Sequence, residues 1–390
     1  MGYVEEFRFK YLNPTKIIFG REASSRLESE LAVLGVKQAL VITDRHLLTS
    51  TDIPELIRRA IGPRGAGIFG EVQPDSGIEL VNQGAALARK LKVDGVVSLG
   101  GGSSIDTAKG VAALLTLNQE DISSFLRLQA VGKPMVPHLA IPTTAGTGSE
   151  VSFVATIKDR TAKKKLLLTD DHLHPNTAIL DPTLTLRLPS EITAATGIDA
   201  LCHAVEAICS LRSNPVTDAL ATQSIRLVAE NLLICVEDGK NLKARGQQLL
   251  ASTLAGIAFS NAFTGMGHAL AHAVGAYFDV PHGTASAILL APSLCYNLKA
   301  AAGRYTLIAR AVGIQQPAGR SDLDLAQQVI EWVRSLVRQL PLPQRLREVG
   351  VPLEAIPSLA AEALTDSSIL TNPVRIIDPV ELEKVLKEAW

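Results

Sequence analysis

The sequence predicts two domains: an α/β domain with a parallel sheet over residues 1–188, and an all-helical domain over residues 189–390. The length of 390 residues fits two to three domains of ordinary size. The first half alternates short apolar runs with amphipathic stretches, which is typical of strands and helices that alternate along the chain. The second half consists of long stretches rich in Ala, Leu and Glu at helical spacing, and the change falls near residues 185–192.

Three apolar runs in the first half indicate strands, at residues 39–42, 95–99 and 138–141. They are apolar on both faces, as strands of a parallel sheet are when helices cover both sides. Between the first two runs, residues 78–91 carry apolar side chains at helical spacing. A strand, a helix and a strand joined by Gly-rich connections predict an α/β sheet with crossovers.

Helical periodicity dominates the second half. The clearest stretches are residues 195–211, 218–236 and 323–337, which contain few clusters of β-branched residues. We therefore expect this half to contain no sheet.

The composition excludes several classes of protein. Hydrophobic residues make up 47% and charged residues 20%, and 38 Lys and Arg against 39 Asp and Glu give a net charge of −1. No long basic tract is present, so neither a nucleic acid nor an anionic membrane is expected as a partner. Four cysteines without a CxxC pair argue against a disulfide scaffold and a thiolate zinc site. Without an apolar signal core or an apolar run of about 18 residues, we expect a cytoplasmic protein that does not span a membrane.

A glycine-rich turn, Gly100–Gly102, follows a predicted strand and opens a predicted helix. The N–H groups of Gly102, Ser103 and Ser104 at the positive end of this helix could bind a pyrophosphate. The pattern is neither GxGxxG nor a Walker A loop. The alternative is a tight strand–helix turn capped by Ser103.

A second loop of small and hydroxyl-bearing residues, 142–150, follows the next predicted strand. Ligands of open α/β sheets bind at the carboxyl ends of the strands, where both loops are expected. Asp44 ends another strand, and a carboxylate there can accept hydrogen bonds from ribose hydroxyls and repel a 2′-phosphate, which favours NAD over NADP. Its alternative role is a helix N-cap.

Asp199 and four histidines in the helical half predict a metal site. Asp199 and His203 are four residues apart, as are His268 and His272, and His282 follows. This spacing places each pair on one face of a helix. A single histidine is readily explained as a satisfied core residue, but one shared divalent cation would compensate all of these buried polar groups at once. Carboxylate and imidazole ligands without thiolate suit Fe²⁺, Zn²⁺, Co²⁺ or Mn²⁺.

With these segments, the chain resembles the iron-dependent (group III) alcohol dehydrogenase family. The resemblance is carried by GGGSSIDTAKG (100–110), PTTAGTGSE (142–150), GIDALCHAVE (197–206) and GMGHALAHAVGAYFDVPHG (265–283). It implies an N-terminal Rossmann-like dinucleotide-binding domain, a helical metal-binding domain of the dehydroquinate synthase-like type, and a cleft between them. It also implies a homodimer or a larger homo-oligomer.

The resemblance further assigns roles to individual residues. The implied metal ligands are Asp199, His203, His268 and His282, and the implied catalytic histidine is His272. The implied cofactor-binding residues are Asp44, Gly101, Gly102, Ser103, Asp106, Thr143, Thr144, Thr147 and Lys165.

The implied reaction is hydride transfer between a nicotinamide cofactor, NAD rather than NADP, and a primary alcohol or aldehyde bound to Fe²⁺, with Zn²⁺ as the alternative metal. His272 would relay the hydroxyl proton or, alternatively, orient the metal ligands. The competing enzymes are a zinc-dependent polyol oxidoreductase resembling glycerol dehydrogenase and a lyase resembling dehydroquinate synthase, both of which use three protein ligands. A non-catalytic sensor of NAD or metal is the competing hypothesis from another class.

One position departs from the family pattern. Where lactaldehyde-reducing members carry an Asn shortly after the threonine loop, this chain has Val154. Without that amide, a second hydroxyl of a vicinal diol has one hydrogen-bond partner fewer. Together with Phe153 and Phe259, Val154 predicts a pocket for a more apolar substrate side chain.

Overall fold

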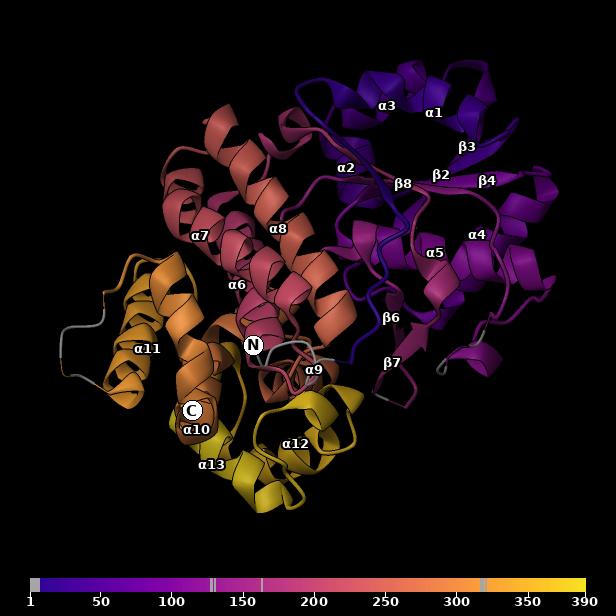
Figure 1. Ribbon diagram of the computed structural model, residues 1–390. Helices are drawn as coiled ribbons and strands as arrows, with labels where there is room; N and C mark the ends of the chain where they lie inside the picture. The colour runs from indigo at the N-terminus through magenta and orange to yellow at the C-terminus, as the bar shows by residue number, and fades with distance from the viewer. Residues whose placement is uncertain (1–7, 127–128, 130, 163, 316–318, 320) are drawn as a thin grey trace. The chain divides into compact units, whose positions relative to one another are not determined.

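The structure is a computed structural model that describes residues 8–126, 129, 131–162, 164–315, 319 and 321–390 (Figure 1). It contains two compact units. The α/β unit comprises residues 13–188 and 240–249, and the helical unit comprises residues 189–239, 250–390 and the described residues before 13.

These units differ from the predicted division at residue 188 in two short segments. Leu12 exchanges hydrogen bonds with the side chain of Asn261: its N–H donates to Oδ1 (2.7 Å), and its carbonyl accepts from Nδ2 (3.0 Å). This pairing holds the first described residues to the helical unit. The segment 240–249 packs instead with the α/β unit, where Arg245 donates to the carbonyl oxygen of Leu188 (3.1 Å).

A parallel sheet of six strands forms the centre of the α/β unit, in the order β1-β8-β5-β4-β2-β3. The strands are β1 Lys16–Phe19, β2 Ala39–Asp44, β3 Gly65–Val72, β4 Gly95–Gly100, β5 His138–Pro142 and β8 Thr177–Leu180. A separate antiparallel pair consists of β6 Val154–Asp159 and β7 Lys164–Thr169. The three predicted strands are confirmed as β2, β4 and β5, whereas the other strands were not predicted.

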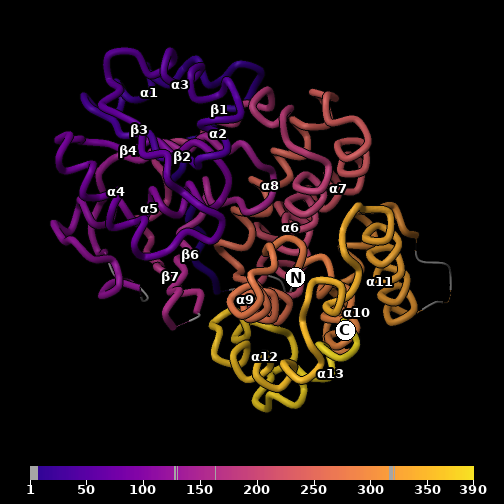
Figure 2. The backbone as a smooth tube through the Cα atoms, turned by 180° about the vertical axis from the view of Figure 1, so that it is seen from behind, coloured from indigo at the N-terminus to yellow at the C-terminus, as the bar shows by residue number. Residues whose placement is uncertain are grey.

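Helices cover both faces of this sheet (Figures 1 and 2). Side chains alternate along each strand, so Leu40 and Ile42 pack into one apolar cluster while Val41 packs into the other. The first cluster includes α4 Ile78–Lys90 and α5 Gly102–Leu117. The second includes α1 Leu27–Val33 and α3 Ile53–Ile61, and the short α2 is Arg45–Ser50. This two-sided cover explains why the strands of the sequence are apolar on both faces.

The helical unit has no strand among the described residues after 188, as predicted. Its helices are α6 Ser190–Cys209, α7 Pro215–Glu237, α8 Leu242–Ala262, α9 Met266–Phe278, α10 His282–Ala311, α11 Asp322–Arg338, α12 Ile356–Ala363 and α13 Pro379–Ala389. The first turns of α8 belong to the α/β unit. The predicted helices at 195–211, 218–236 and 323–337 are confirmed as α6, α7 and α11.

Two apolar clusters stabilise the helical unit, and α10 contributes to both. Leu290 of α10 packs with α6, α7, α8 and α11, whereas Leu289 packs with α9, α12 and α13. Because consecutive residues of a helix point about 100° apart, one long helix can serve two cores. Through these two clusters α10 packs against both α6 and α9.

Two helices, α6 and α7, are long and apolar enough by length and composition to cross a membrane, which differs from the expectation that no such stretch exists. The expectation considered unbroken apolar runs, which isolated polar residues such as Asp199 interrupt. The mean hydropathy of a whole helix stays high despite these interruptions. In α6, 83% of the apolar window is buried inside the structure, against 39% in α7. A helix that is apolar all round is a core helix or a membrane span, and α6 packs as a core helix here.

Lys109 of α5 is fully buried and connects this helix to the segment before β6. Its Nζ donates to the carbonyl and hydroxyl oxygens of Ser152 (both 2.9 Å) and to the carbonyl oxygen of Val154 (2.6 Å). Burial lowers the pKa of Lys109 to about 8, although the nearby carboxylates of Asp106 and Glu150 act in the opposite direction.

Lys109→Met should therefore change how stability depends on pH. The unfolded chain keeps the lysine proton up to about pH 10.5, whereas the folded protein releases it near pH 8, so this group makes the free energy of unfolding rise with pH between those values. The unfolding free energy of the wild type minus that of the variant should increase by up to about 1.4 kcal/mol per pH unit in this window. Urea unfolding of both proteins at a series of pH values measures this difference. A difference that stays constant would show that Lys109 titrates normally.

Candidate metal and dinucleotide sites

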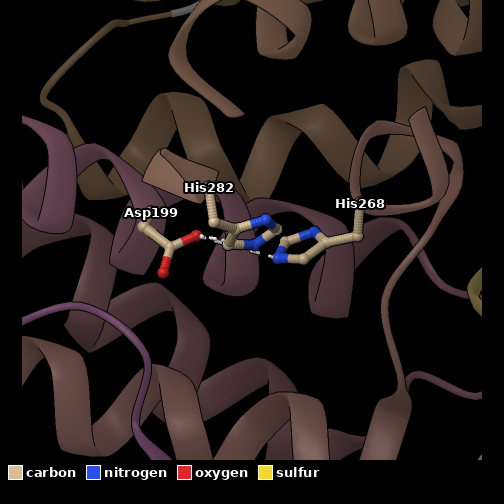
Figure 3. A group of neighbouring side chains, drawn as sticks. All are labelled: Asp199, His268 and His282. Atoms are coloured by element: carbon tan, nitrogen blue, oxygen red, sulfur yellow. Dashed lines mark ion pairs between the residues drawn. The ribbon is translucent and has the colours of Figure 1, made fainter. Parts of the chain in front are cut away.

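Three of the predicted metal ligands come together in the helical unit. Asp199 lies on α6, His268 on α9, and His282 is the first residue of α10. One ligand atom from each lies within 4.8 Å of the others. The Asp199 Oδ1 is 3.3 Å from His282 Nε2 and 4.0 Å from His268 Nε2 (Figure 3). This group, which we call the ligand group, is therefore drawn from three separate helices.

His203, the fourth predicted ligand, lies beside the ligand group rather than within it. It follows Asp199 by one turn of α6, and its Nδ1 is 3.9 Å from Asp199 Oδ2. Its ring centroid is 4.4 Å from that of His268. On another side, the ring of Phe259 stacks on it with centroids 4.5 Å apart and an interplanar angle of 22°.

Gly283 allows α10 to begin close to α6. A Cβ atom at position 283 would lie 2.2 Å from the carbonyl oxygen of Ala195, a backbone atom of α6 that cannot turn away. Only a residue without a side chain fits there. Because His282 precedes this glycine, the close approach brings its ring to the carboxylate of Asp199.

The residues of the ligand group fit a divalent cation. His268 is buried, and its Nε2 has no hydrogen-bond partner in the part of the chain that the structure describes. Burial alone would lower the pKa of His268, but the carboxylates of Glu206, Asp199 and Asp366 raise it above its usual value. Negative charge is thus concentrated around buried imidazole nitrogens. A carboxylate with imidazoles and no thiolate suits Fe²⁺ or Zn²⁺.

His272 lies next to the ligand group and pairs with a carboxylate from far along the chain. Its Nδ1 is 2.7 Å from Asp366 Oδ2, and its ring centroid is 5.1 Å from that of His282. Burial would raise the pKa of Asp366, but His272 and hydrogen bonds from Ser368 hold it well below its usual range. The sequence offers no signal for Asp366 as a partner of His272, because 94 residues separate the two.

The glycine loop and the threonine loop of the α/β unit face each other. A Cβ atom on Gly101 would lie 3.2 Å from the side chain of Thr144, and one on Gly102 would lie 2.7 Å from that of Thr147. Thr143 donates its N–H to the carbonyl oxygen of Gly100 (3.0 Å). A side chain at position 102 would therefore collide with Thr147, and one at position 101 would crowd Thr144.

The start of α5 offers two of the three predicted N–H groups. Among the described residues, the N–H groups of Gly102 and Ser103 have no acceptor, as an anion site requires. The prediction was wrong for Ser104, whose N–H donates to the carbonyl oxygen of Gly101 (3.0 Å) in the tight first turn. The Ser103 hydroxyl accepts from the N–H of Asp75 (3.2 Å) and does not cap α5, so the alternative of a Ser103-capped turn is not what the structure contains.

Asp44 has the helix-cap role, and its predicted contact to the cofactor ribose stays a prediction. It is the N-cap of α2, and its Oδ1 accepts from the N–H of Leu47 (2.8 Å). Its Oδ2 lies 3.4 Å from the position that a Cβ of Gly100 would take, so the carboxylate also borders the glycine loop. A helix cap and a contact to a bound ribose are therefore compatible here.

Lys165 lies near the same loop through a residue that sequence analysis missed. Its buried Nζ is 2.8 Å from Asp75 Oδ1, and Asp75 in turn contacts Ser103. Asp106 is turned away from the loop: its Oδ2 accepts from the N–H of Thr156 in β6 (2.9 Å), and burial raises the pKa of its carboxyl group. The structure gives Asp106 a bond inside the unit, and its contact to the cofactor stays a prediction.

The predicted substrate residues belong to different units. Phe153 and Val154 lie in the α/β unit and Phe259 in the helical unit. Phe153 is buried, and its ring centroid is 6.3 Å from that of His174. The common substrate pocket of these three residues stays a prediction.

Comparison with known proteins agrees with these features along the whole chain. The family model "Iron-containing alcohol dehydrogenase" matches residues 14–182, and "Fe-containing alcohol dehydrogenase family, C-terminal" matches residues 193–390. A 1,3-propanediol dehydrogenase of Citrobacter freundii is 38% identical over 98% of this chain and 99% of its own. An NAD-dependent methanol dehydrogenase of Bacillus methanolicus is 35% identical over 96% and 98%. The crystal structure of a 1,3-propanediol oxidoreductase superposes with a TM-score of 0.93 at 37% identity, covering 98% and 100%.

A parallel α/β unit with an anion-binding turn, together with a buried carboxylate–imidazole group, defines a metal-dependent oxidoreductase with a nicotinamide cofactor. The chain belongs to the iron-containing alcohol dehydrogenase family. It is a metal-dependent alcohol dehydrogenase and aldehyde reductase, which confirms the resemblance and the predicted fold class.

Proposed function

We propose that the protein transfers a hydride between NAD and a small primary alcohol or aldehyde, with Fe²⁺, or Zn²⁺ in its place, held by Asp199, His203, His268 and His282. The observation that carries this proposal is the ligand group, whose three members approach one another within 4.8 Å from three helices. Thiolate ligands are absent from this group, which fits both metals.

When bound, the metal supplies Lewis acidity toward the substrate oxygen, and the nicotinamide accepts or donates the hydride. The residues of the chain supply charge and position. The Asp199 carboxylate offsets part of the charge of the cation, and the imidazoles bind it as neutral ligands. In the α/β unit, the N–H groups of Gly102 and Ser103 bind the pyrophosphate.

His272 is the proposed proton carrier. Because the Asp366 carboxylate accepts from Nδ1–H, the Nε2 of His272 is left as the acceptor for the proton that alcohol oxidation releases. Asp366 also stabilises the imidazolium that forms. During aldehyde reduction the same nitrogen donates the proton. The alternative role, orientation of the ligands, is supported by the ring of His272 stacking on that of His282.

The preference for NAD rests on Asp44. Its carboxylate borders the glycine loop, where a 2′-phosphate on the adenosine ribose would meet a like charge. The methanol dehydrogenase relative carries NAD dependence in its name, which supports the same preference.

For the substrate, we favour a small primary alcohol over a vicinal diol. Val154 offers no side-chain hydrogen bond to a second hydroxyl, and Phe153 and Phe259 are apolar. The two relatives described above are named for 1,3-propanediol and methanol, which are both small primary alcohols.

In the cell, we propose a cytoplasmic homodimer or larger homo-oligomer. No disulfide links the four cysteines, all of which the structure describes, and this suits a reducing compartment. Leu370 and Ile377 expose 76% and 73% of their surface in the single chain. Large apolar side chains exposed in this way are typical of a surface that a second subunit covers.

One observation keeps a second function in view. The ligand group contains three residues and not His203, and three protein ligands are what a zinc-dependent polyol oxidoreductase resembling glycerol dehydrogenase would use. The contribution of His203 to metal binding separates the two functions.

The first prediction of this proposal concerns the metal. A chelator should abolish turnover, and Fe²⁺ or Zn²⁺ should restore it, as NADH absorbance with a panel of alcohols and aldehydes would report. His268→Ala and His282→Ala should each purify without metal. Loss of a hydrogen-bond partner of a metal ligand weakens metal binding by roughly 10- to 100-fold. If His203 is itself a fourth ligand, His203→Ala should weaken metal binding by more than that. Unchanged metal affinity of His203→Ala would favour the three-ligand alternative.

A second prediction concerns the cofactor. Asp44→Asn removes the charge but keeps a good N-cap for α2, so folding should be preserved. The ratio of kcat/KM with NADP to kcat/KM with NAD should rise by at least about 10-fold, which corresponds to about 1.4 kcal/mol. Steady-state kinetics with both cofactors measure this ratio. If it does not move, Asp44 acts only as a helix cap.

A third prediction concerns the proton carrier. His272→Ala should retain its metal and lower kcat by about 100-fold, because general acid–base catalysis contributes that order of magnitude. His172→Ala, which changes an exposed histidine of the α/β unit, serves as the control and should leave kcat unchanged. Metal content and kcat across pH would be measured for both. Full activity of His272→Ala at every pH would refute the proton relay.

A further inference from the structure

We propose that Glu206 is the positioning residue for the metal ligand His268, holding the proton of its imidazole on Nδ1 so that Nε2 is free to bind the metal. This inference rests on the proposed ligand set. Glu206 lies seven residues after Asp199 on α6, which places both carboxylates on one face of the helix. Sequence analysis assigned no role to it.

Glu206 accepts three hydrogen bonds from the beginning of α9. Its Oε2 accepts from the N–H of Gly265 (2.8 Å) and lies 2.5 Å from His268 Nδ1, and its Oε1 accepts from the N–H of Gly267 (2.8 Å). The carboxylate is buried. It lies at the N-terminus of α9, where the dipole of that helix favours negative charge. The two carboxylate oxygens can thus accept from both backbone N–H groups and from the imidazole at once.

These hydrogen bonds determine which nitrogen of His268 carries the proton. An ionised carboxylate can only accept, so Nδ1 must donate to it, and in the neutral ring Nε2 keeps its lone pair. Nε2 is the nitrogen on the side of Asp199, 4.0 Å from Oδ1. A metal ligand oriented by a carboxylate on its other nitrogen is a common arrangement in metalloproteins.

The glycines on either side of Met266 leave room for this carboxylate. A Cβ atom on Gly267 would lie 2.6 Å from Glu206 Oε1, and one on Gly265 would lie 3.3 Å from it. Larger residues at these positions would displace the carboxylate from His268. The glycine spacing in this segment thus has a physical reason besides helix initiation.

Glu206→Gln separates the positioning role from a role in capping α9. An amide has one acceptor oxygen and one NH₂ group. If the oxygen faces Gly265 and His268, the NH₂ group opposes the N–H of Gly267. In the other orientation the NH₂ group faces His268 Nδ1, which must then accept, and the proton moves to Nε2 where it blocks the metal. Metal binding by His268 is impaired in the second orientation and its helix is disturbed in the first.

The experiment is a Co²⁺ titration of the metal-free protein, without cofactor or alcohol, followed by the visible absorption of the bound ion. Glu206→Gln should weaken Co²⁺ binding by about 10- to 100-fold and change the absorption spectrum. Glu30→Gln is the matched control, because it alters another buried carboxylate, which pairs with Lys16 in the α/β unit. It should bind Co²⁺ as the wild type does.

His282→Ala identifies the site that is titrated. If His282→Ala binds Co²⁺ like the wild type, the proposed ligand set is wrong, and this inference falls with it. If His282→Ala loses Co²⁺ while Glu206→Gln binds as tightly as the wild type, the ligand set stands and the positioning role is overturned.

A measurement on the wild type avoids dependence on how well the variant folds. In metal-free protein labelled with ¹⁵N-histidine, at a pH high enough for the ring to be neutral, the His268 signals, assigned by their loss in His268→Ala, should report a protonated Nδ1 and an unprotonated Nε2. A proton found on Nε2 would overturn the inference.

Discussion

The buried carboxylate of Asp199 is the constraint on which the helical unit depends. Only 2% of this residue is exposed, and a charge removed from water costs several kcal/mol unless other charges or polar groups compensate it. The compensation comes from imidazoles near the start of α9 and at the start of α10, so these two helices must begin beside the middle of α6. Gly283 permits that convergence, because any side chain there would collide with the backbone of α6.

The same device holds two histidines in place. His268 and His272 each direct Nδ1 toward a carboxylate, that of Glu206 in one case and that of Asp366 in the other. In the neutral form of either ring, a proton on Nδ1 leaves the second nitrogen with its lone pair. The two rings differ in where they lie. Nε2 of His268 faces Asp199, whereas the ring of His272 stacks on that of His282 at the edge of the ligand group. In the proposed function, this one arrangement would serve both a metal ligand and a carrier of protons.

The α/β unit presents backbone N–H groups at the start of α5, where we propose that a pyrophosphate binds. Glycines at 101 and 102 face threonine side chains, so the two loops close on each other without Cβ atoms between them. Farther along α5, the ammonium of Lys109 donates to the carbonyl groups of Ser152 and Val154. This contact joins the helix that starts at the glycine loop to the segment before β6.

The sequence by itself determined what local pattern can encode: buried strands β2, β4 and β5, the long helices, the spacing of Asp199 and the histidines, and the motifs of the family. Tertiary structure decided the contacts between distant residues. It placed His203 beside the ligand group, turned Asp106 toward β6, and used the N–H of Ser104 inside its own turn. It also paired Glu206, Asp75 and Asp366 with partners 28 to 94 residues away. Periodicity and spacing report which face of an element is buried, but they carry no information on which atoms of another element will meet it there.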